Sequence, residues 1–285
     1  MASSTYRIKT MDRQDLDLAI DWAAAEGWNP GLHDGDCFYA ADPNGFLMGV
    51  LGDEAIASIS VVKYDDTFGF LGFYIVKPEF RGQGYGFQLW QAGLDYLQGC
   101  NIGLDGVVAQ QENYLQSGFQ LAYRNIRFEG SRTHSGGLNL AAAVVPLASV
   151  PIDVVLDYDL AFFPAHRSRF LKCWLTQPDS KSFGIMERGS LVGYGTIRPC
   201  RSGYKIGPLF ANTPELADML FQALTDQVTL GQKFYLDVPE VNDAAIALAN
   251  RYKLTQCFET ARMYMQAPPA LPLNRIFGVT TFELG

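Results

Sequence analysis

Hydrophobic and polar residues alternate in three consecutive stretches of the chain, at 46–51, 55–63 and 70–78. Short polar turns at 52–54 and 65–66 separate these stretches. Alternation bounded by Gly and Asp is typical of strands with one buried face that follow one another in an antiparallel meander. The first half of the chain is therefore expected to begin its sheet with three adjacent strands.

The same order of patterns returns at an offset of about 135 residues, which indicates a duplicated structural unit. Strand-like stretches at 183–187, 190–198 and 204–210 are separated by turns at 188–189 and 202–203. The second half is therefore expected to contain a meander of the same kind.

A helical pattern follows each meander, because apolar residues recur at steps of three and four. In the first half these residues are Phe87, Trp90, Leu94 and Leu97. In the second half they are Leu216, Leu220, Ala223 and Leu224. Thr213 and Pro214 are typical of a helix start, and Gly99 and Gly231 are expected to end the two helices.

A strand, a second helix and a final strand are then expected in each half. The predicted strands are 102–108 and 119–128 in the first half, and 234–238 and 257–265 in the second. The fold class is therefore α+β, with two tandem domains that are each a mixed, mostly antiparallel sheet flanked by helices. The Gly-rich segment 131–143 is interpreted as a linker between domains at 1–130 and 144–285.

Composition narrows the class of protein. The chain has 285 residues, of which 48% are hydrophobic and 18% charged, enough for a substantial core. It has no apolar run of the ~18 residues that suggest a membrane span, and its first residues lack the apolar core of a signal peptide. Its 5 cysteines form no CxxC pair and its 3 histidines are isolated, so we expect a cytoplasmic protein without a metal. A net charge of −8 argues against a nucleic-acid partner and suits a cationic substrate.

Three glycines alternate in the segment Arg81-Gly82-Gln83-Gly84-Tyr85-Gly86, between the strand 70–78 and the helix that follows. Glycine lets backbone N–H groups approach an anion closely, and the positive end of the helix dipole adds attraction. This glycine loop is therefore expected to bind the phosphate groups of a ligand.

Two motifs give the glycine loop a family context. The first is Val76-x-Pro78-x-x-Arg81-Gly82-x-Gly84-x-Gly86, and the second is Tyr114-x-x-x-Gly118-Phe119. Together they resemble the signature of the GNAT superfamily of N-acetyltransferases. The resemblance implies a GNAT-like domain that binds acetyl-coenzyme A as its co-substrate.

The resemblance also implies roles for particular residues. The implied cofactor-binding residues are Ile75, Val76, Arg81, Gly82, Gln83, Gly84, Tyr85 and Gly86. The main chain at 75–76 would pair with the pantetheine arm, and the glycine loop would hold the pyrophosphate. Tyr114 matches the general acid of the family, which protonates the departing thiolate, although a packing role is the alternative in a chain with 14 tyrosines. One departure is Val107, at a position where the family often has Asn.

The second half matches the family more weakly. Ala249 stands at the tyrosine position, Lys253 and Leu254 replace the usual Gly-Phe, and the loop at 211–214 has neither glycine nor arginine. The resemblance therefore implies a tandem-GNAT chain in which the second domain is degenerate and only the first binds coenzyme A.

The acceptor is expected to bind at the segment 27–38, where turn residues alternate with ionisable ones. Trp28, Asp34 and Asp36 are the candidate binding residues on this segment. Asp34 or His33 is the candidate that removes the proton from the amine. Turn formation is the alternative explanation for the two acids.

Three further places are considered for the acceptor. Tyr74 is a candidate contact, and Glu79 and Glu112 are weaker alternatives. The aromatic and charged residues at 158–167 could close over the acceptor from the second half, although helix packing explains them equally well.

These observations lead to a hypothesis of function. The chain is expected to be an acetyl-coenzyme A-dependent N-acetyltransferase that acts on a primary amine of a small, cationic molecule by direct attack in a ternary complex. Two alternatives stay open. One is a non-catalytic sensor that binds acyl-coenzyme A, and the other is a protein or peptide N-acetyltransferase whose second domain docks the partner.

Overall fold

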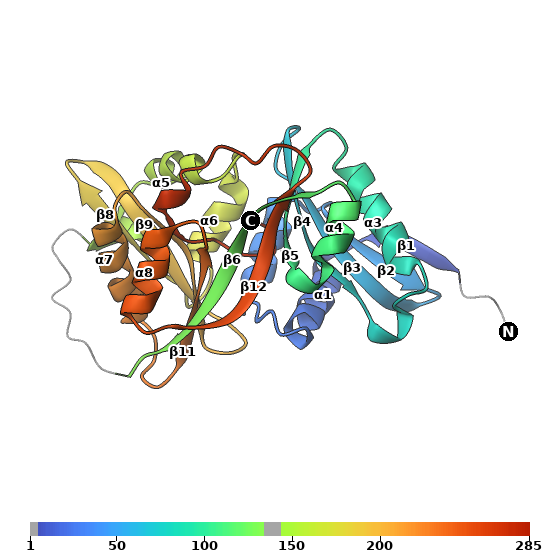
Figure 1. Cartoon of the computed structure of the whole chain (residues 1–285), viewed down its shortest axis with the longest axis horizontal. Helices are drawn as coiled ribbons and strands as arrows, with labels where there is room; N and C mark the ends of the chain where they lie inside the picture. The colour runs from blue at the N-terminus through green and yellow to red at the C-terminus, as the bar shows by residue number, and fades with distance from the viewer. Residues whose placement is uncertain (1–4, 134–143) are drawn as a thin grey trace.

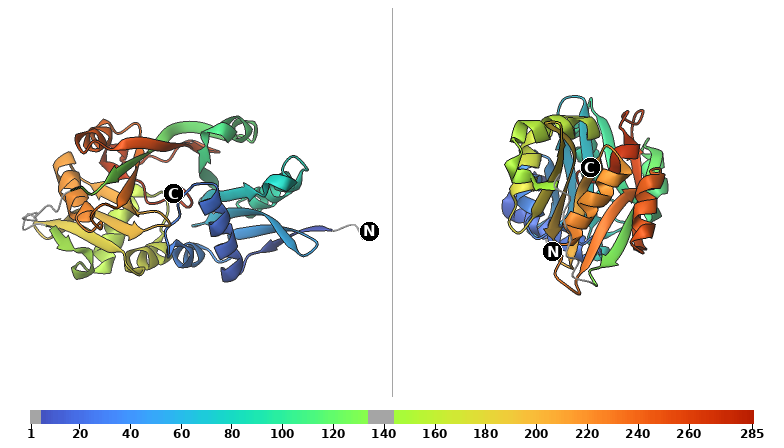
Figure 2. Two further views of the ribbon diagram at one scale, coloured as in Figure 1. Left: turned by 90° about the horizontal axis from the view of Figure 1, so that it is seen from below. Right: turned by 90° about the vertical axis from the view of Figure 1, so that its left-hand side faces the viewer.

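A single twisted sheet runs through both halves of the chain. The structure is a computed structural model and describes residues 5–133 and 144–285. The first half lies on the right of Figure 1 and the second half on the left. The left view of Figure 2 shows the same elongated arrangement from below, and the right view, seen from one end, shows helices on both sides of the sheet.

The two halves have the same order of elements. In the first half these are β1 (Tyr6–Thr10), α1 (Arg13–Ala25), α2 (Asp34–Ala41), β2 (Phe46–Leu51), β3 (Glu54–Lys63), β4 (Phe68–Val76), α3 (Tyr85–Tyr96), β5 (Asn101–Val107), α4 (Gln111–Gln116) and β6 (Gln120–Ser131). In the second half they are β7 (Val144–Pro146), α5 (Ile152–Asp159), α6 (Ser168–Thr176), β8 (Lys181–Glu187), β9 (Ser190–Pro199), β10 (Tyr204–Ala211), α7 (Pro214–Thr225), β11 (Lys233–Pro239), α8 (Asp243–Arg251), β12 (Thr255–Tyr264) and the short β13 (Ile276–Gly278). The predicted α+β class and the predicted duplication are confirmed.

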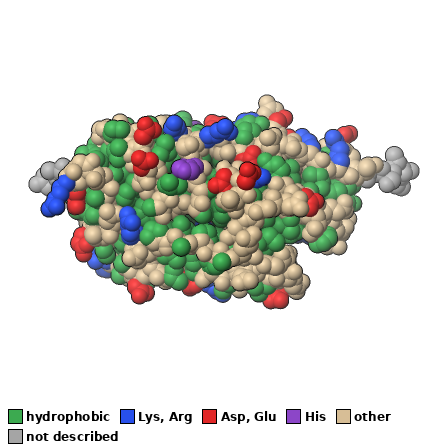
Figure 3. All heavy atoms as spheres, turned by 90° about the horizontal axis from the view of Figure 1, so that it is seen from above, with side chains coloured by type: hydrophobic (Ala, Val, Ile, Leu, Met, Phe, Trp, Pro, Cys, Tyr) green, Lys and Arg blue, Asp and Glu red, His purple; other side chains and the backbone are tan. Residues whose placement is uncertain are grey.

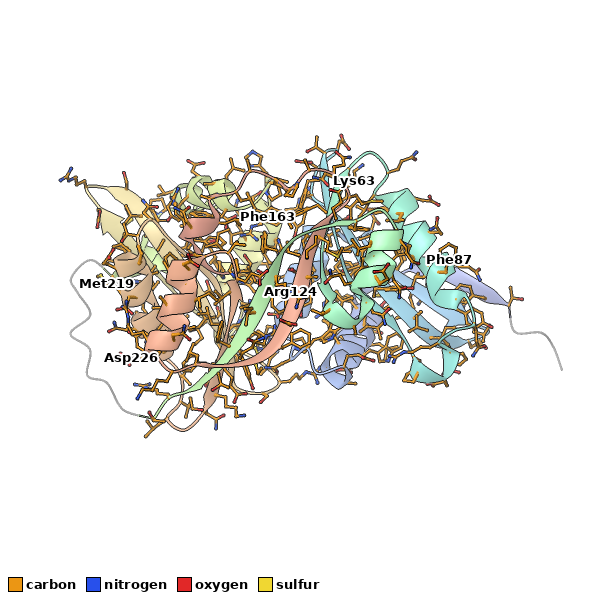
Figure 4. The ribbon with its side chains drawn as sticks, in the orientation of Figure 1. Lys63, Phe87, Arg124, Phe163, Met219 and Asp226 are labelled. Carbon is orange, nitrogen blue, oxygen red and sulfur yellow. The ribbon has the colours of Figure 1, made fainter. Side chains whose placement is uncertain are left out.

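The last long strand of each half crosses into the sheet of the other half. The strand order is β1-β2-β3-β4-β5-β12-β6-β11-β10-β9-β8-β7, so β12 separates β5 from β6. Thr260 of β12 pairs with Val107 of β5 on one side and with Asn125 of β6 on the other. Arg124, labelled where the two strands cross in Figure 4, forms an ion pair with Glu259 of β12 at 2.8 Å. The sheet of the first half is therefore completed by a strand of the second.

The two halves also share a core on one face of the sheet. Helices α1 and α2 cover this face of the first half, and α2 packs against α6 of the second half. Phe38 of α2 stacks on Trp174 of α6 with ring centroids 6.1 Å apart. Helix α3 and Tyr114 of α4 lie in the separate core on the opposite face. Burial of aromatic surface between α2 and α6 thus adds to the strand exchange in joining the halves.

The start of α7 follows the prediction, whereas the buried face of α3 differs from it. Thr213 caps α7 by accepting a hydrogen bond from the Leu216 N–H at 3.4 Å. Phe87 was expected in the buried face of α3, but it is 67% exposed and lies on the outer side of the helix (Figure 4). Trp90 and Leu97 are buried as expected. The prediction is wrong at Phe87 because this residue lies in the first turn of α3, beside the glycine loop and not over the sheet.

The predicted linker falls largely outside the described residues, which omit 134–143. Ser131, its first residue, is the last residue of β6 and pairs with Lys233 of β11. The strand predicted at 119–128 therefore extends further, because β11 offers it a partner.

Candidate functional site

β4 and β5 are neighbours for only part of their length. β4 pairs with β5 from Phe68 to Leu71, and the two strands then separate. A cavity of about 790 Å³ opens in this gap, lined by residues 72–76 of β4 and 104–107 of β5. On the edge that faces β5, the main chain of β4 has no strand partner beyond Leu71. Its N–H and C=O groups there can pair with an extended ligand.

The glycine loop forms one end of this cavity. Gly82 and Gly84 have φ values of 74° and 84°, in the left-handed region that other residues avoid, and a Cβ on either would meet open space. Gly84 is the N-cap of α3, and no side chain caps that helix. Among the described residues no acceptor is recorded for the backbone N–H groups from Gly82 to Phe87. These groups are therefore free to bind an anion at the positive end of the helix dipole.

Two side chains of the loop fix its shape. The Nε of Arg81 donates to the Val76 carbonyl at 2.7 Å, and its Nη2 pairs with Glu26 at 2.6 Å. The Nε2 of Gln83 donates to the Glu79 carbonyl at 2.8 Å. These contacts tie the loop to the end of β4, to Glu26 after α1 and to the turn at Glu79, so its N–H groups keep their direction.

Tyr114 lies inside the cavity wall. Its side chain is 8% exposed, and its ring stacks on Trp90 with centroids 5.8 Å apart. A Cβ at Gly106 of β5 would lie 2.2 Å from this ring, so glycine there leaves room for it. Burial, together with the nearby Tyr74, raises the pKa of Tyr114 to about 12. The hydroxyl is therefore protonated at neutral pH and can act as a proton donor.

The opposite end of the cavity is built largely by the second half. The residues of the second half that line it are Phe258, Thr260, Phe282 and Glu283. The rings of Phe258 and Phe282 have centroids 6.3 Å apart, and the guanidinium of Arg127 lies 4.7 Å from the centroid of Phe282. Trp28 lines the cavity from the first half. This end is therefore walled by aromatic rings, with a carboxylate among them.

The predicted acceptor segment docks against the second half and reaches the cavity only through Trp28. Asn29 exchanges two hydrogen bonds with the main chain of Ser202, each at 2.9 Å. The Leu32 N–H donates to the Pro199 carbonyl at 3.0 Å. The segment is thus held against the turn between β9 and β10.

The ionisable residues of that segment, which were predicted to bind the acceptor, do not line the cavity. Asp34 is 1% exposed and forms a bidentate ion pair with Arg198 of β9. The Nε and Nη2 of Arg198 donate to its two carboxylate oxygens, at 2.8 and 3.1 Å. Asp36 pairs with Arg13 at 2.7 Å, and the His33 side chain lies 3.9 Å from Asp179. A buried carboxylate needs such a partner, and the interface between the halves supplies it.

The cluster at 158–167 anchors a neighbouring segment and does not cover the cavity. Arg167 forms two hydrogen bonds with Asp159, at 2.7 and 2.8 Å, and stacks on Phe163, which Figure 4 labels. Its Nη1 also donates to Thr280 at 3.0 Å. The charges of this cluster therefore hold the segment that carries Phe282 and Glu283.

The structure brings most of the predicted cofactor residues to one place. Those that line the cavity are Ile75, Val76, Arg81, Gly82, Gly84 and Gly86, together with the predicted acceptor contacts Trp28 and Tyr74. The side chains of Gln83 and Tyr85 lie outside the lining, as do the weaker alternatives Glu79 and Glu112. Sequence reasoning missed Phe258, Phe282 and Glu283. Phe258 reaches the cavity on the exchanged strand β12, and the other two lie on a segment far from β4 in the sequence.

Three other features of the described residues bear on the kind of site. They contain no group of three His, Cys, Asp or Glu side chains that could hold a metal ion. None of their helices has the length and apolar character needed to cross a bilayer. On the face shown in Figure 3, acidic and basic side chains are interspersed and form no patch of one sign.

Both halves match known protein families. Residues 13–117 match the family described as "Acetyltransferase (GNAT) family", and residues 155–278 match "Acetyltransferase (GNAT) domain". A curated relative, the holothin acyltransferase of Pseudoalteromonas sp. (strain SANK 73390), is 31% identical over 281 residues, which cover 99% of this chain and 95% of that protein.

Solved structures share the fold across the whole chain. A putative acetyltransferase from Pyrococcus horikoshii has a TM-score of 0.81 at 20% identity and covers 100% of this chain and 97% of its own. A tandem GNAT protein from the clavulanic acid biosynthesis pathway has a TM-score of 0.64 at 12% identity, covering 93% and 100%. At these identities the similarity shows the tandem fold and not the substrate.

Proposed function

Because the chain belongs to the GNAT family of acetyltransferases, we propose that it transfers an acetyl group from acetyl-coenzyme A to a primary amine of a small molecule. The curated acyltransferase relative supports an N-acyltransferase activity. One observation carries the proposal. The glycine loop, with its free N–H groups, opens into a cavity that continues between β4 and β5 to Tyr114.

The residues of the first half can bind the co-substrate and assist its reaction. The loop N–H groups from Gly82 to Phe87 suit the pyrophosphate, and the unpaired edge of β4 suits the pantetheine arm. When bound, the thioester supplies the activated acetyl group. Tyr114 then donates its proton to the departing sulfur, which its burial in protonated form allows.

The acceptor end of the cavity supports a small, cationic amine. Of the three acids that line the cavity, Glu26 and Asp105 are paired with arginines, and Glu283 is the acid at the acceptor end. The net charge of −8 also favours the approach of a cationic molecule. Since the glycine loop and the aromatic end share one cavity, donor and acceptor can be bound together, and we propose direct attack in a ternary complex.

The proposal is tested by thiol release from acetyl-, propionyl- and butyryl-coenzyme A with a panel of amines. The panel contains benzylamine, tyramine, spermidine, glucosamine, short peptides and holothin, the last because of the name of the curated relative. Release with acetyl-coenzyme A and a small amine supports the proposal. Binding of coenzyme A without release from any donor would show a sensor, and release with peptides alone would show a peptide acetyltransferase.

A further inference from the structure

A segment of the second half, residues 279–285, is buried between the two halves. From the second half, Arg167 donates a hydrogen bond to the Thr280 hydroxyl at 3.0 Å. From the first half, the Tyr64 hydroxyl donates to the Leu284 carbonyl at 2.9 Å. The Leu284 side chain is 0% exposed and lies in the core that contains Phe73 of β4. The position of this segment is therefore fixed from both sides.

Glu283 meets β4 at the point where that strand leaves β5. A Cβ on Gly72 would lie 2.2 Å from the Glu283 carbonyl oxygen, so the two main chains touch there. Gly72 directly follows Leu71, the last residue of β4 that pairs with β5. Glu283 is 3% exposed and lines the cavity. Glu283 therefore lines the same enclosed space as the unpaired edge of β4.

The carboxylate of Glu283 has no cationic partner in direct contact. Thr281 donates a hydrogen bond to it, and no ion pair within 4.0 Å involves it among the described residues. Three buried cations, on β6, β9 and β10, lie near enough to attract this carboxylate, and the two arginines among them are paired with other acids. Arg127 pairs with Asp237, Arg198 pairs with Asp34, and Lys205 donates to the Trp28 carbonyl. A buried carboxylate with unused acceptor positions is costly unless something else pairs with it.

The two other acids of the cavity lining are already occupied. Asp105 accepts from Arg262 at 2.5 and 2.9 Å and from Asn125 at 2.8 Å. Glu26 pairs with Arg81 at 2.6 Å. Of the acids that line the cavity, Glu283 is the one that makes no direct contact with a cation among the described residues.

We infer that Glu283 binds the ammonium group of the acceptor and takes its proton, so that the second half supplies the base of the reaction. This inference rests on the proposed function. Glu283 passes the proton of the ammonium to solvent, so that its carboxylate is free again. The neutral nitrogen then forms a bond to the thioester carbon, and the carbon–sulfur bond breaks. The nitrogen gives its excess proton to the Glu283 carboxylate, and the sulfur takes the proton of Tyr114. Transfer of a proton from Glu283 to the Tyr114 oxygen through solvent then restores both groups.

Glu283→Gln, Glu283→Asp and a control, Glu187→Gln on the exposed end of β8, test this inference. For Glu283→Gln we expect kcat to fall about 100-fold or more, while the dissociation constant for coenzyme A stays within about 2-fold. Glu283→Asp should recover part of kcat. The rate of Glu283→Gln should rise with pH as the free amine comes to predominate. Melting temperatures of all variants verify folding.

A binding measurement tests the inference without turnover. Benzylammonium should raise the melting temperature of the unchanged protein more than benzyl alcohol does. This difference should be lost in Glu283→Gln and kept in Glu187→Gln. An unaltered kcat and pH profile in Glu283→Gln, or no preference of the unchanged protein for the ammonium, would overturn the inference. If no amine causes thiol release, the proposed function fails, and the binding measurement still decides whether Glu283 receives a cation.

Discussion

The carbonyl oxygen of Trp28 in the first half accepts a hydrogen bond from Nζ of Lys205 in the second, at 3.1 Å. Arg127 donates to the same oxygen at 2.9 Å. The side chain of Trp28 lines the cavity, whereas Lys205 does not. Burial and the neighbouring Arg127 lower the pKa of Lys205. A lysine outside the cavity therefore helps to set the position of one of its walls.

Lys205→Met should weaken acceptor binding without affecting the co-substrate. Loss of one hydrogen bond to the Trp28 carbonyl, about 1 kcal/mol, should raise the KM for the acceptor about 5-fold. The dissociation constant for coenzyme A should stay unchanged, because Lys205 is remote from the glycine loop. Steady-state kinetics with both substrates measure this. Lys181→Met, at an exposed position of β8, is the control, and equal effects of the two changes would contradict a role for Lys205 in positioning.

Gly84→Ala should weaken coenzyme A binding beyond its effect on stability. Placing alanine at a position with φ of 84° costs about 1–2 kcal/mol of stability, and the added methyl group would occupy the open space beside the loop. We expect the dissociation constant to rise about 10-fold or more. Gly189→Ala is a matched control, because Gly189 has φ of 82° and open space but lies in the β8–β9 turn. Calorimetric titration with coenzyme A should show weaker binding in Gly84→Ala and unchanged binding in Gly189→Ala.

Tyr114→Phe should lower kcat about 100-fold or more while coenzyme A still binds. The aromatic ring that stacks on Trp90 remains, so packing is preserved. Tyr39→Phe in α2 removes a hydroxyl outside the cavity and should leave kcat unchanged. Rapid-quench measurement of a single turnover would separate the chemical step from product release, and an unchanged chemical step would remove Tyr114 from its proposed role.

Asp34→Ala should destabilise the protein by about 3–5 kcal/mol, because it leaves the buried Arg198 without its partner. Asp36→Ala breaks an exposed ion pair with Arg13 and should cost less than about 1 kcal/mol. Urea unfolding of the two variants makes this comparison within one helix. If Asp34→Ala keeps the stability of the unchanged protein but releases no thiol, the catalytic role predicted for Asp34 from the sequence would be supported instead.

The protein should lose stability between about pH 10 and pH 12, because burial raises the pKa values of Tyr6 and Tyr114 to about 12. The folded state then holds these protons more tightly than the unfolded state. Their contribution is complete below about pH 10 and disappears as the pH rises through 12. Urea unfolding at a series of alkaline pH values, with the absorbance of tyrosinate as a second signal, measures this. A free energy of unfolding that stays constant over this range would contradict it.

The glycine loop could be predicted from the sequence because it depends on local geometry, whereas the role of Tyr114 was implied by the family resemblance. Positive φ at Gly82 and Gly84 requires glycine, and the order of strand, loop and helix follows from residues next to one another. The meanders were predictable for the same reason, since their turns join neighbouring strands.

The acceptor end could not be predicted in this way. β6 and β12 have similar alternating patterns, and nothing in either strand tells which half it completes. The sequence near Asp34 shows a charged turn, but its partner Arg198 lies 164 positions away. Glu283 looks like an isolated acid until the segment 279–285 is placed against Gly72. The sequence therefore shows where the charged residues are, but it does not show which of them form ion pairs with distant residues.

The exchange of β12 also matters while the chain is being synthesised. Val107 at the edge of β5 pairs with Thr260, which leaves the ribosome about 150 residues later. At about 5–20 residues per second this delay is about 8–30 s. During that time the edge of β5 has no native partner and can pair with the same strand of another nascent chain. Slower translation of the second half would prolong this exposure and should lower the yield of soluble protein.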